Sequence, residues 1–229
     1  MVRKRLTIAI LFLFIAGAIF FILLNSGENF DLGSNSMGYV TKDIYNHYGS
    51  EGPKIAVITG MHPREDLSTA VVPEVIKLYA LTHNIEIINY QVTVTKDPEV
   101  FSTGRLNGES LVASYVIPDI KKSDYDLVII CHDHEKGYGE GYYVATPSMD
   151  SKSIILAERV HKLLPDFNYY QRDTSKRTQS SSIKKVDMPI TASGTPVFVY
   201  EMPEWVSYLE SFINSIDLID ASFNILKNN

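Results

Sequence analysis

A histidine and a glutamate spaced three apart are the first residues of this sequence that could do chemistry together. His62 and Glu65 come directly after an apolar run, residues 54–59, that ends at Gly60. Where a strand opens into a helix, side chains three apart point the same way, as two ligands of one metal ion must. A surface histidine beside a solvated glutamate has the same spacing, so the pair alone leaves both interpretations open.

Two further apolar runs end in residues of the same kind. The run DLVIIC at 126–131 leads directly into His-Asp-His-Glu at 132–135, and the run PVFVY at 196–200 leads into Glu201. In open α/β sheets the ligand site lies outside the carboxyl ends of the strands. Two histidines and one carboxylate can hold zinc and leave a position open for water, while a separate carboxylate moves the proton. The sequence therefore predicts a hydrolytic metal site.

The elements that must position these residues follow an alternating pattern. Strands are expected at 54–59, 85–94, 126–131, 142–145 and 196–201. Helices are expected at 67–81, 109–122, 151–164 and 205–226, with loops at 95–107 and 169–185. Strands that alternate with helices predict an α/β fold, a three-layer sandwich with a mainly parallel or mixed central sheet.

Composition narrows the class of protein. The chain has 229 residues, of which 45% are hydrophobic and 21% charged, so it can build a core. The net charge is −6 and no basic cluster follows the first five residues, which argues against nucleic acid as a partner. The single cysteine, Cys131, excludes an internal disulfide and a cysteine-rich structural zinc site.

The start of the chain predicts a membrane anchor. Residues 1–5 carry three basic side chains, and residues 6–24 contain no charge. Nineteen residues at about 1.5 Å each span roughly the hydrocarbon core of a bilayer. The basic flank favours a cytoplasmic N-terminus, which makes the protein a single-pass cell-membrane protein with its body outside. The helix is then the contact with the lipid bilayer.

A cleaved signal peptide is the alternative, because Ala16-Gly17-Ala18 provides small residues. The apolar residues continue past that point, which favours the uncleaved anchor. The chain is thus expected to divide into a cytoplasmic flank (1–5), an anchor (6–24), a polar linker (25–39) and a catalytic domain (40–229).

Taken in order, the motifs resemble the zinc carboxypeptidase superfamily, including its compact succinylglutamate desuccinylase/aspartoacylase branch. The resemblance covers roughly residues 53–215. It rests on Gly-x-His-x-Arg-Glu at 60–65, on a histidine directly after the second apolar strand, and on Glu-Met-Pro at 201–203.

The resemblance implies one zinc ion held by His62, Glu65 and a later histidine. His132 is favoured as the third ligand because it follows the strand directly. His134 stays an alternative, because two residues two apart on a continuing strand share a face.

The resemblance also implies the catalytic groups. Glu201 takes the place of the general base and acid. Arg105, on the loop expected at 95–107, takes the place of the arginine that polarises the scissile carbonyl and stabilises the oxyanion. Arg64, inside the zinc motif, is expected to brace the site.

Two departures from the family pattern concern the substrate. The family's Asn-Arg pair, which clamps a substrate carboxylate, is absent, since residues 109–113 read Glu-Ser-Leu-Val-Ala. Arg172 or Arg177 in the polar loop could supply the clamp instead. The aspartate that the family places before the third ligand is also missing, with Ile130 two positions before His132.

These observations predict a membrane-anchored, extracytoplasmic zinc-dependent amide hydrolase, a metallocarboxypeptidase or an N-acyl amino acid deacylase. Its substrate would be a peptide or an N-acyl amino acid, cleaved by zinc-activated water. One alternative is a non-catalytic metal- or peptide-binding surface module on the same fold. A nucleophilic hydrolase is disfavoured because the sequence has no Gly-x-Ser-x-Gly and Cys131 lies in an apolar strand.

Overall fold

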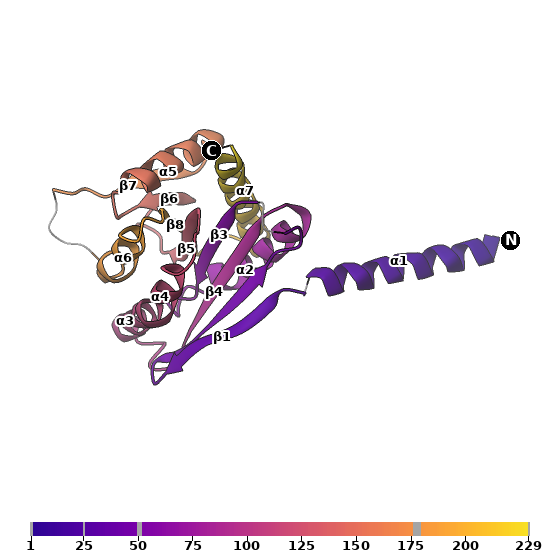
Figure 1. The fold of residues 1–229 in the computed structure, drawn as a ribbon, viewed down its shortest axis with the longest axis horizontal. Helices are drawn as coiled ribbons and strands as arrows, with labels where there is room; N and C mark the ends of the chain where they lie inside the picture. Colours follow the sequence, from indigo (N-terminus) through magenta and orange to yellow (C-terminus); the bar gives the residue numbers. More distant parts are fainter. Residues whose placement is uncertain (1, 25, 50–51, 176–179, 229) are drawn as a thin grey trace.

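One eight-stranded mixed sheet organises the molecule (Figure 1). The structure is a computed structural model and describes residues 2–24, 26–49, 52–175 and 180–228. The strand order is β1-β2-β4-β3-β5-β8-β6-β7. The strands are β1 (Glu28–Asn35), β2 (Gly38–Tyr45), β3 (Lys54–Thr59), β4 (Glu86–Val94), β5 (Leu127–His134), β6 (Tyr143–Thr146), β7 (Asn168–Gln171) and β8 (Val197–Pro203).

Four parallel strands form the centre of this sheet. β4, β3, β5 and β8 pair in parallel, while β2 joins β4 and β6 joins β8 in antiparallel orientation. All eight residues of β5 are buried, as expected of an apolar strand that is covered on both faces. The apolar runs of the sequence thus become the middle of the sheet.

Helices cover both faces of the sheet and complete three layers (Figure 1). One apolar core lies between the sheet and α2, α5 and α7, and the other lies between the sheet and the segment from α3 to α4 together with α6. The predicted α/β sandwich with a mixed sheet is confirmed. The helices of the body are α2 (Asp66–Thr82), α3 (Phe101–Leu111), α4 (Ile117–Ile120), α5 (Ser151–Leu163), α6 (Met188–Thr191) and α7 (Tyr208–Lys227), with π-helical turns η1 (Val112–Val116) and η2 (Ile183–Asp187).

The structure corrects three local expectations. Most of the segment predicted as a linker, 25–39, is folded: β1 pairs along its length with β2. An edge strand needs only main-chain partners on one side, so polar, exposed side chains do not prevent pairing. The expected loop 95–107 contains the start of α3, and the expected loop 169–185 contains the end of β7 and the start of η2.

The first helix, α1 (Val2–Leu24), extends away from the body (Figure 1). An 18-residue window within its stretch Arg5–Leu24 has a mean hydropathy of 3.0, and none of that window is buried. It is long and apolar enough to cross a membrane, which agrees with the expected anchor in length and composition.

Glycine lets α3 lie against the loop that follows β3. A Cβ on Gly108 would stand 1.7 Å from the carbonyl oxygen of Met61, the residue before His62. A Cβ on Gly104 would meet Pro63 and the carbonyl of Pro98 at 2.9 Å. Gly104, inside the expected loop 95–107, and Gly108, just after it, therefore allow this helix to approach so closely.

We expect Gly108→Ala to destabilise the protein by about 1–3 kcal/mol, because the helix must move off the loop. Alanine in a helix interior otherwise stabilises relative to glycine. Chemical denaturation measures the change, and Gly104→Ala, with the longer contacts, is the matched comparison. A stabilised Gly108→Ala variant would contradict the packing described here.

Candidate metal centre

The first two residues of the site lie on the short connection between β3 and α2. After β3 the chain turns at Gly60, which has a φ of +72°. A side chain there would be strained and would also meet the carbonyl oxygen of Val92 at 2.3 Å. The turn buries His62, and Glu65 follows as the residue immediately before α2.

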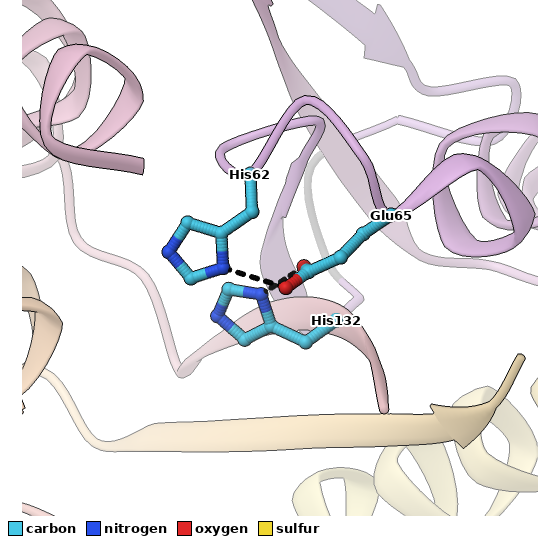
Figure 2. A group of neighbouring side chains, drawn as sticks. All are labelled: His62, Glu65 and His132. Atoms are coloured by element: carbon cyan, nitrogen blue, oxygen red, sulfur yellow. Dashed lines mark hydrogen bonds and ion pairs between the residues drawn. The ribbon is translucent and has the colours of Figure 1, made fainter. Parts of the chain in front are cut away.

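His132 joins them from the end of β5. Its Nδ1 lies 2.5 Å from Oε2 of Glu65, and Nδ1 of His62 lies 2.7 Å from Oε1 of the same carboxylate. The two imidazoles stack with their centroids 4.3 Å apart. Figure 2 shows both Nδ1 atoms directed at the Glu65 carboxylate. One nitrogen from each ring and one carboxylate thus converge from two strand ends.

The charge state of Glu65 reflects this convergence. Burial by itself favours a neutral carboxyl, but His132 and His62 outweigh it and lower the pKa of Glu65 to about 2. Glu65 is therefore an anion between two imidazoles, which is the donor set that a divalent cation takes.

Asp133 holds the two strand ends together. Its carboxylate accepts hydrogen bonds from the backbone N–H groups of Leu67 and Ser68, at 2.7 and 2.8 Å. These are among the first N–H groups of α2, which have no partner inside the helix. The residue next to His132 therefore caps the helix that begins after Glu65, and the distance between the two parts of the site is fixed.

A fully buried carboxylate stands behind His62. Glu109 on α3 has Oε1 at 3.9 Å from Nε2 of His62, the ring nitrogen that faces away from Glu65. The same oxygen accepts a hydrogen bond from the Ser181 hydroxyl at 2.6 Å. Carboxylates in this position orient ligating imidazoles and raise their basicity.

Glu201 lies beside His132 on the neighbouring strand. The two residues are Cα partners in the parallel register of β5 and β8. Burial raises the pKa of Glu201 to about 8, against the opposing effect of His132, and its Oε2 has no hydrogen-bond partner among the described residues. Glu201 is thus a buried carboxyl group beside His132, and its Oε2 has no hydrogen-bond partner among the described residues.

Arg105 approaches from the other side, on α3 rather than on the loop expected from the sequence. Its Nη1 lies 3.7 Å from Oε1 of Glu65. Arg105 and Arg64 both place their guanidinium groups over the ring of Phe101, at 5.7 and 5.8 Å from its centroid. The described contact of Arg64 is thus with the exposed ring of Phe101, which lines the cleft.

His134 is directed elsewhere. Its Nε2 donates to the carbonyl oxygen of Gly141 at 2.9 Å, and its ring packs against Tyr143 and Trp205. Between the two histidines that the sequence left open, the structure brings His132, and not His134, to Glu65.

A cleft of about 970 Å³ is lined by side chains of the site, namely His62, Glu65, Arg105, His132 and Glu201. Arg172 lines the same cleft, whereas Arg177 falls outside the described residues. Asp187 also faces it, buried and with Oδ1 unpartnered among the described residues. Burial raises the pKa of Asp187 to about 7, against the opposing effect of His132.

Sequence reasoning missed Asp133, Glu109 and Asp187 as parts of the site. Asp133 stands between the two histidines of 132–135, and this was the one available signal. Glu109 lies in residues 109–113, where the sequence showed only that the Asn-Arg pair is absent. Nothing in the sequence pattern distinguishes Asp187.

The residues fit a metal ion. Donor atoms of His62, Glu65 and His132 all lie within 4.8 Å of one another. Three protein ligands with nitrogen and carboxylate oxygen donors are typical of catalytic metal sites, which keep one coordination position open for water. A metal site at these three residues is therefore consistent with their type, spacing and burial.

The fold is similar to that of solved metallopeptidases. The metallo-carboxypeptidase from Burkholderia cenocepacia superimposes with a TM-score of 0.62 at 13% identity, over 93% of this chain and 67% of that chain. The cell shape determinant protein Csd4 from Helicobacter pylori, bound to a tripeptide, superimposes with a TM-score of 0.54 at 12% identity, over 88% of this chain and 55% of that chain.

No protein-family model and no curated protein sequence matches the chain. The structural likeness confirms the resemblance to the zinc carboxypeptidase superfamily at the level of the fold. At 10–13% identity, the roles of individual residues do not follow from it.

We expect Asp133→Ala to weaken metal binding about tenfold or more, because His62 and Glu65 lose their tie to β5. The free energy of unfolding should also fall by about 1–3 kcal/mol, since two helix N–H groups lose their acceptor. A competition titration with a chromophoric chelator measures the metal affinity.

Asp150→Ala is the matched control. Asp150 caps α5 through Ser153 N at 2.9 Å and does not line the cleft. It should cost stability, about 1 kcal/mol, with unchanged metal affinity. Equal metal affinities in the two variants would contradict the role given to Asp133.

Proposed function

We propose that this protein is a membrane-anchored, extracytoplasmic zinc-dependent amide hydrolase of the metallocarboxypeptidase or N-acyl amino acid deacylase type. One observation carries the proposal: two imidazole Nδ1 atoms meet one carboxylate, with the unpartnered Glu201 on the adjacent strand. The metallopeptidase fold supports it.

His62, Glu65 and His132 would hold the zinc ion. Bound there, zinc would act as a Lewis acid on the scissile carbonyl and lower the pKa of a water molecule. Asp133 fixes the separation of the strand ends through its hydrogen bonds to the start of α2. Glu109 places a negative charge 3.9 Å from the far nitrogen of His62, where it would favour an N–H on that nitrogen and leave Nδ1 free for the metal.

Glu201 and Arg105 would do the remaining chemistry. Beside a bound metal cation, Glu201 would have a lower pKa and stay a carboxylate, which would accept the proton of the attacking water and pass it to the amide nitrogen that leaves. Arg105 places a positive charge beside the site, where it stabilises the negative charge that develops on the carbonyl oxygen. The side chain of Arg105 is 27% exposed, so it faces both Glu65 and the open cleft.

A peptide or an N-acyl amino acid is the substrate class that the cleft supports best. The tripeptide bound to Csd4, a protein of similar fold, favours a peptide. The cleft's volume of about 970 Å³ is ample for several residues.

Glu201→Gln should lower the rate of amide hydrolysis at least 100-fold and leave one bound zinc per chain, because it removes only the proton acceptor. Peptides and N-acyl amino acids assayed with zinc-loaded protein provide the measurement. Glu204→Gln, an exposed residue of the same cleft, is the control and should keep its activity.

Retained activity in Glu201→Gln would contradict the mechanism. A wild-type protein that binds zinc but hydrolyses none of these substrates would favour the alternative, a non-catalytic metal- or peptide-binding module.

The anchor is tested separately. We expect the protein to stay with membranes after alkaline carbonate extraction, and external protease to digest its body on spheroplasts. Ile15→Arg should release part of the protein, because arginine at the centre of a span costs about 3 kcal/mol. Thr7→Arg, near the helix end, should have little effect. Release of the unaltered chain by carbonate, or protection of its body, would contradict this topology.

A further inference from the structure

Beyond the metal centre the cleft continues over one face of β8, β6 and β7. The lining side chains alternate along each strand, as they must when they share a face. The alternating set is Val199 and Glu201 from β8, Tyr143, Ala145 and Pro147 from β6 and its continuation, and Tyr170 and Arg172 from β7 and its continuation, while Gln171 and Asp173 also line the cleft at the end of β7.

The strand register arranges these residues in rows. Tyr143 lies opposite Glu201 in the first row. Ala145 lies opposite Val199 on one side and Tyr170 on the other in the second row. Pro147 and Arg172 come directly after the last register pair, Thr146 with Gln171, and Arg172 Nε contacts the carbonyl oxygen of Pro147. Four residues at about 3.3 Å each along the strands and two strand spacings of about 4.8 Å between β8 and β7 place the backbone of Arg172 roughly 16 Å from that of Glu201.

The second row makes an apolar floor. Ala145 has a small side chain, and the Tyr170 ring stands edge-on to Tyr143 with centroids 4.8 Å apart. The second row between Glu201 and Arg172 therefore carries no charged side chain.

Arg172 is held in place without a carboxylate. Its Nε donates to the carbonyl oxygen of Pro147 at 2.7 Å, and the side chain is half-buried. In the described part of the chain it forms no ion pair. The adjacent Asp173 is engaged with the backbone N–H and the hydroxyl of Ser175. Arg172 lines the cleft, and no hydrogen bond or ion pair of its Nη1 or Nη2 groups is found among the described residues.

We propose that Arg172 binds a carboxylate of the substrate about four residues away from the scissile amide, with the floor of Tyr143, Ala145 and Tyr170 under the residues between. The proposal rests on the proposed function, since the scissile amide is placed at the metal centre. It names the substrate class as an acidic peptide rather than a short N-acyl amino acid.

The position of Arg172 distinguishes this site from a clamp next to the scissile bond. The stretch 109–113 on α3 and η1 carries no cation, and Glu109 within it is committed to His62 and Ser181. An arginine pinned through Nε keeps its other donors in a fixed plane, which suits a carboxylate. A substrate must extend several residues from the scissile amide to reach Arg172, whereas a clamp next to the scissile bond would need only a single terminal residue.

The test uses zinc-loaded full-length protein and two sets of N-acetylated hexapeptides, one with a free C-terminal carboxylate and one as the amide, so that both an exopeptidase and an internal amide hydrolase have a cleavable bond. In each set one glutamate moves through the positions before or after the cleavable bond, and a glutamine peptide matches every glutamate peptide. Calorimetric titration of the Glu201→Gln protein measures binding, and kcat/KM of the wild-type protein measures turnover.

At one position about four residues from the bond, the glutamate peptide should bind about 10- to 100-fold more tightly than its glutamine match. Arg172→Gln, in the Glu201→Gln background, should reduce that ratio to about one, and Arg172→Lys should keep part of it. Arg159→Gln removes an arginine that does not line the cleft and should leave the ratio unchanged.

A glutamate preference that survives Arg172→Gln would overturn the proposal, as would the absence of a preference at every position. If binding depends on Arg172 but the wild-type protein shows no turnover, the proposed hydrolase function is contradicted and the carboxylate site is not. If turnover occurs with no dependence on Arg172, the carboxylate site is contradicted and the hydrolase function is not.

Discussion

Parallel pairing of β5 with β3 on one side and β8 on the other is the constraint on which the site depends. The β3 pairing runs as far as Ile58 opposite Ile130, so both strands end at the same edge of the sheet. The β8 pairing places Glu201 opposite His132. Since side chains alternate along a strand, a register shift by one residue would turn His132 or Glu201 to the other face.

Different structural elements form the two ends of the cleft. The metal centre uses the carboxyl ends of parallel strands, where the β3–α2 connection rises above the sheet and is tied down by Asp133. The far end uses the face of β6, which runs antiparallel to β8, together with β7. Side chains beyond the sheet can therefore change what the cleft binds while the donor atoms of the centre stay fixed.

The sequence predicted the parts of the molecule that depend on local pattern. Buried strands are continuous apolar runs, and the positions of His62, His132 and Glu201 at the carboxyl ends of these runs indicate them as candidate site residues. The preference for His132 over His134 followed from counting along the strand; in the structure His132 contacts Glu65 and His134 contacts Gly141.

What the sequence could not predict depends on contacts between distant segments. β1 has the polar composition of a linker and becomes a strand only because β2 offers it a free edge. α3 contains glycines typical of a loop, which instead permit contact with Met61. Asp133 and Glu109 act on residues of other elements, so no spacing within their own segments indicates them.

The attachment point of α1 and the metal centre lie at opposite ends of the sheet. Glu28, the first residue of β1, pairs with Ile44, and that row continues through Ile88 and Ala56 to Val128 near the start of β5. His132 lies four residues further along β5, about 13 Å, and four strands from β1, about 19 Å.

If α1 crosses the bilayer, this geometry has a consequence for the substrate. Only residues 25–27 separate α1 from β1, so the body stays close to the membrane while the carboxyl ends of its parallel strands point away from the attachment point. The cleft then opens toward the aqueous side rather than toward the lipid. A water-soluble acidic peptide reaches such a cleft directly, whereas a substrate embedded in the bilayer would have to leave it first.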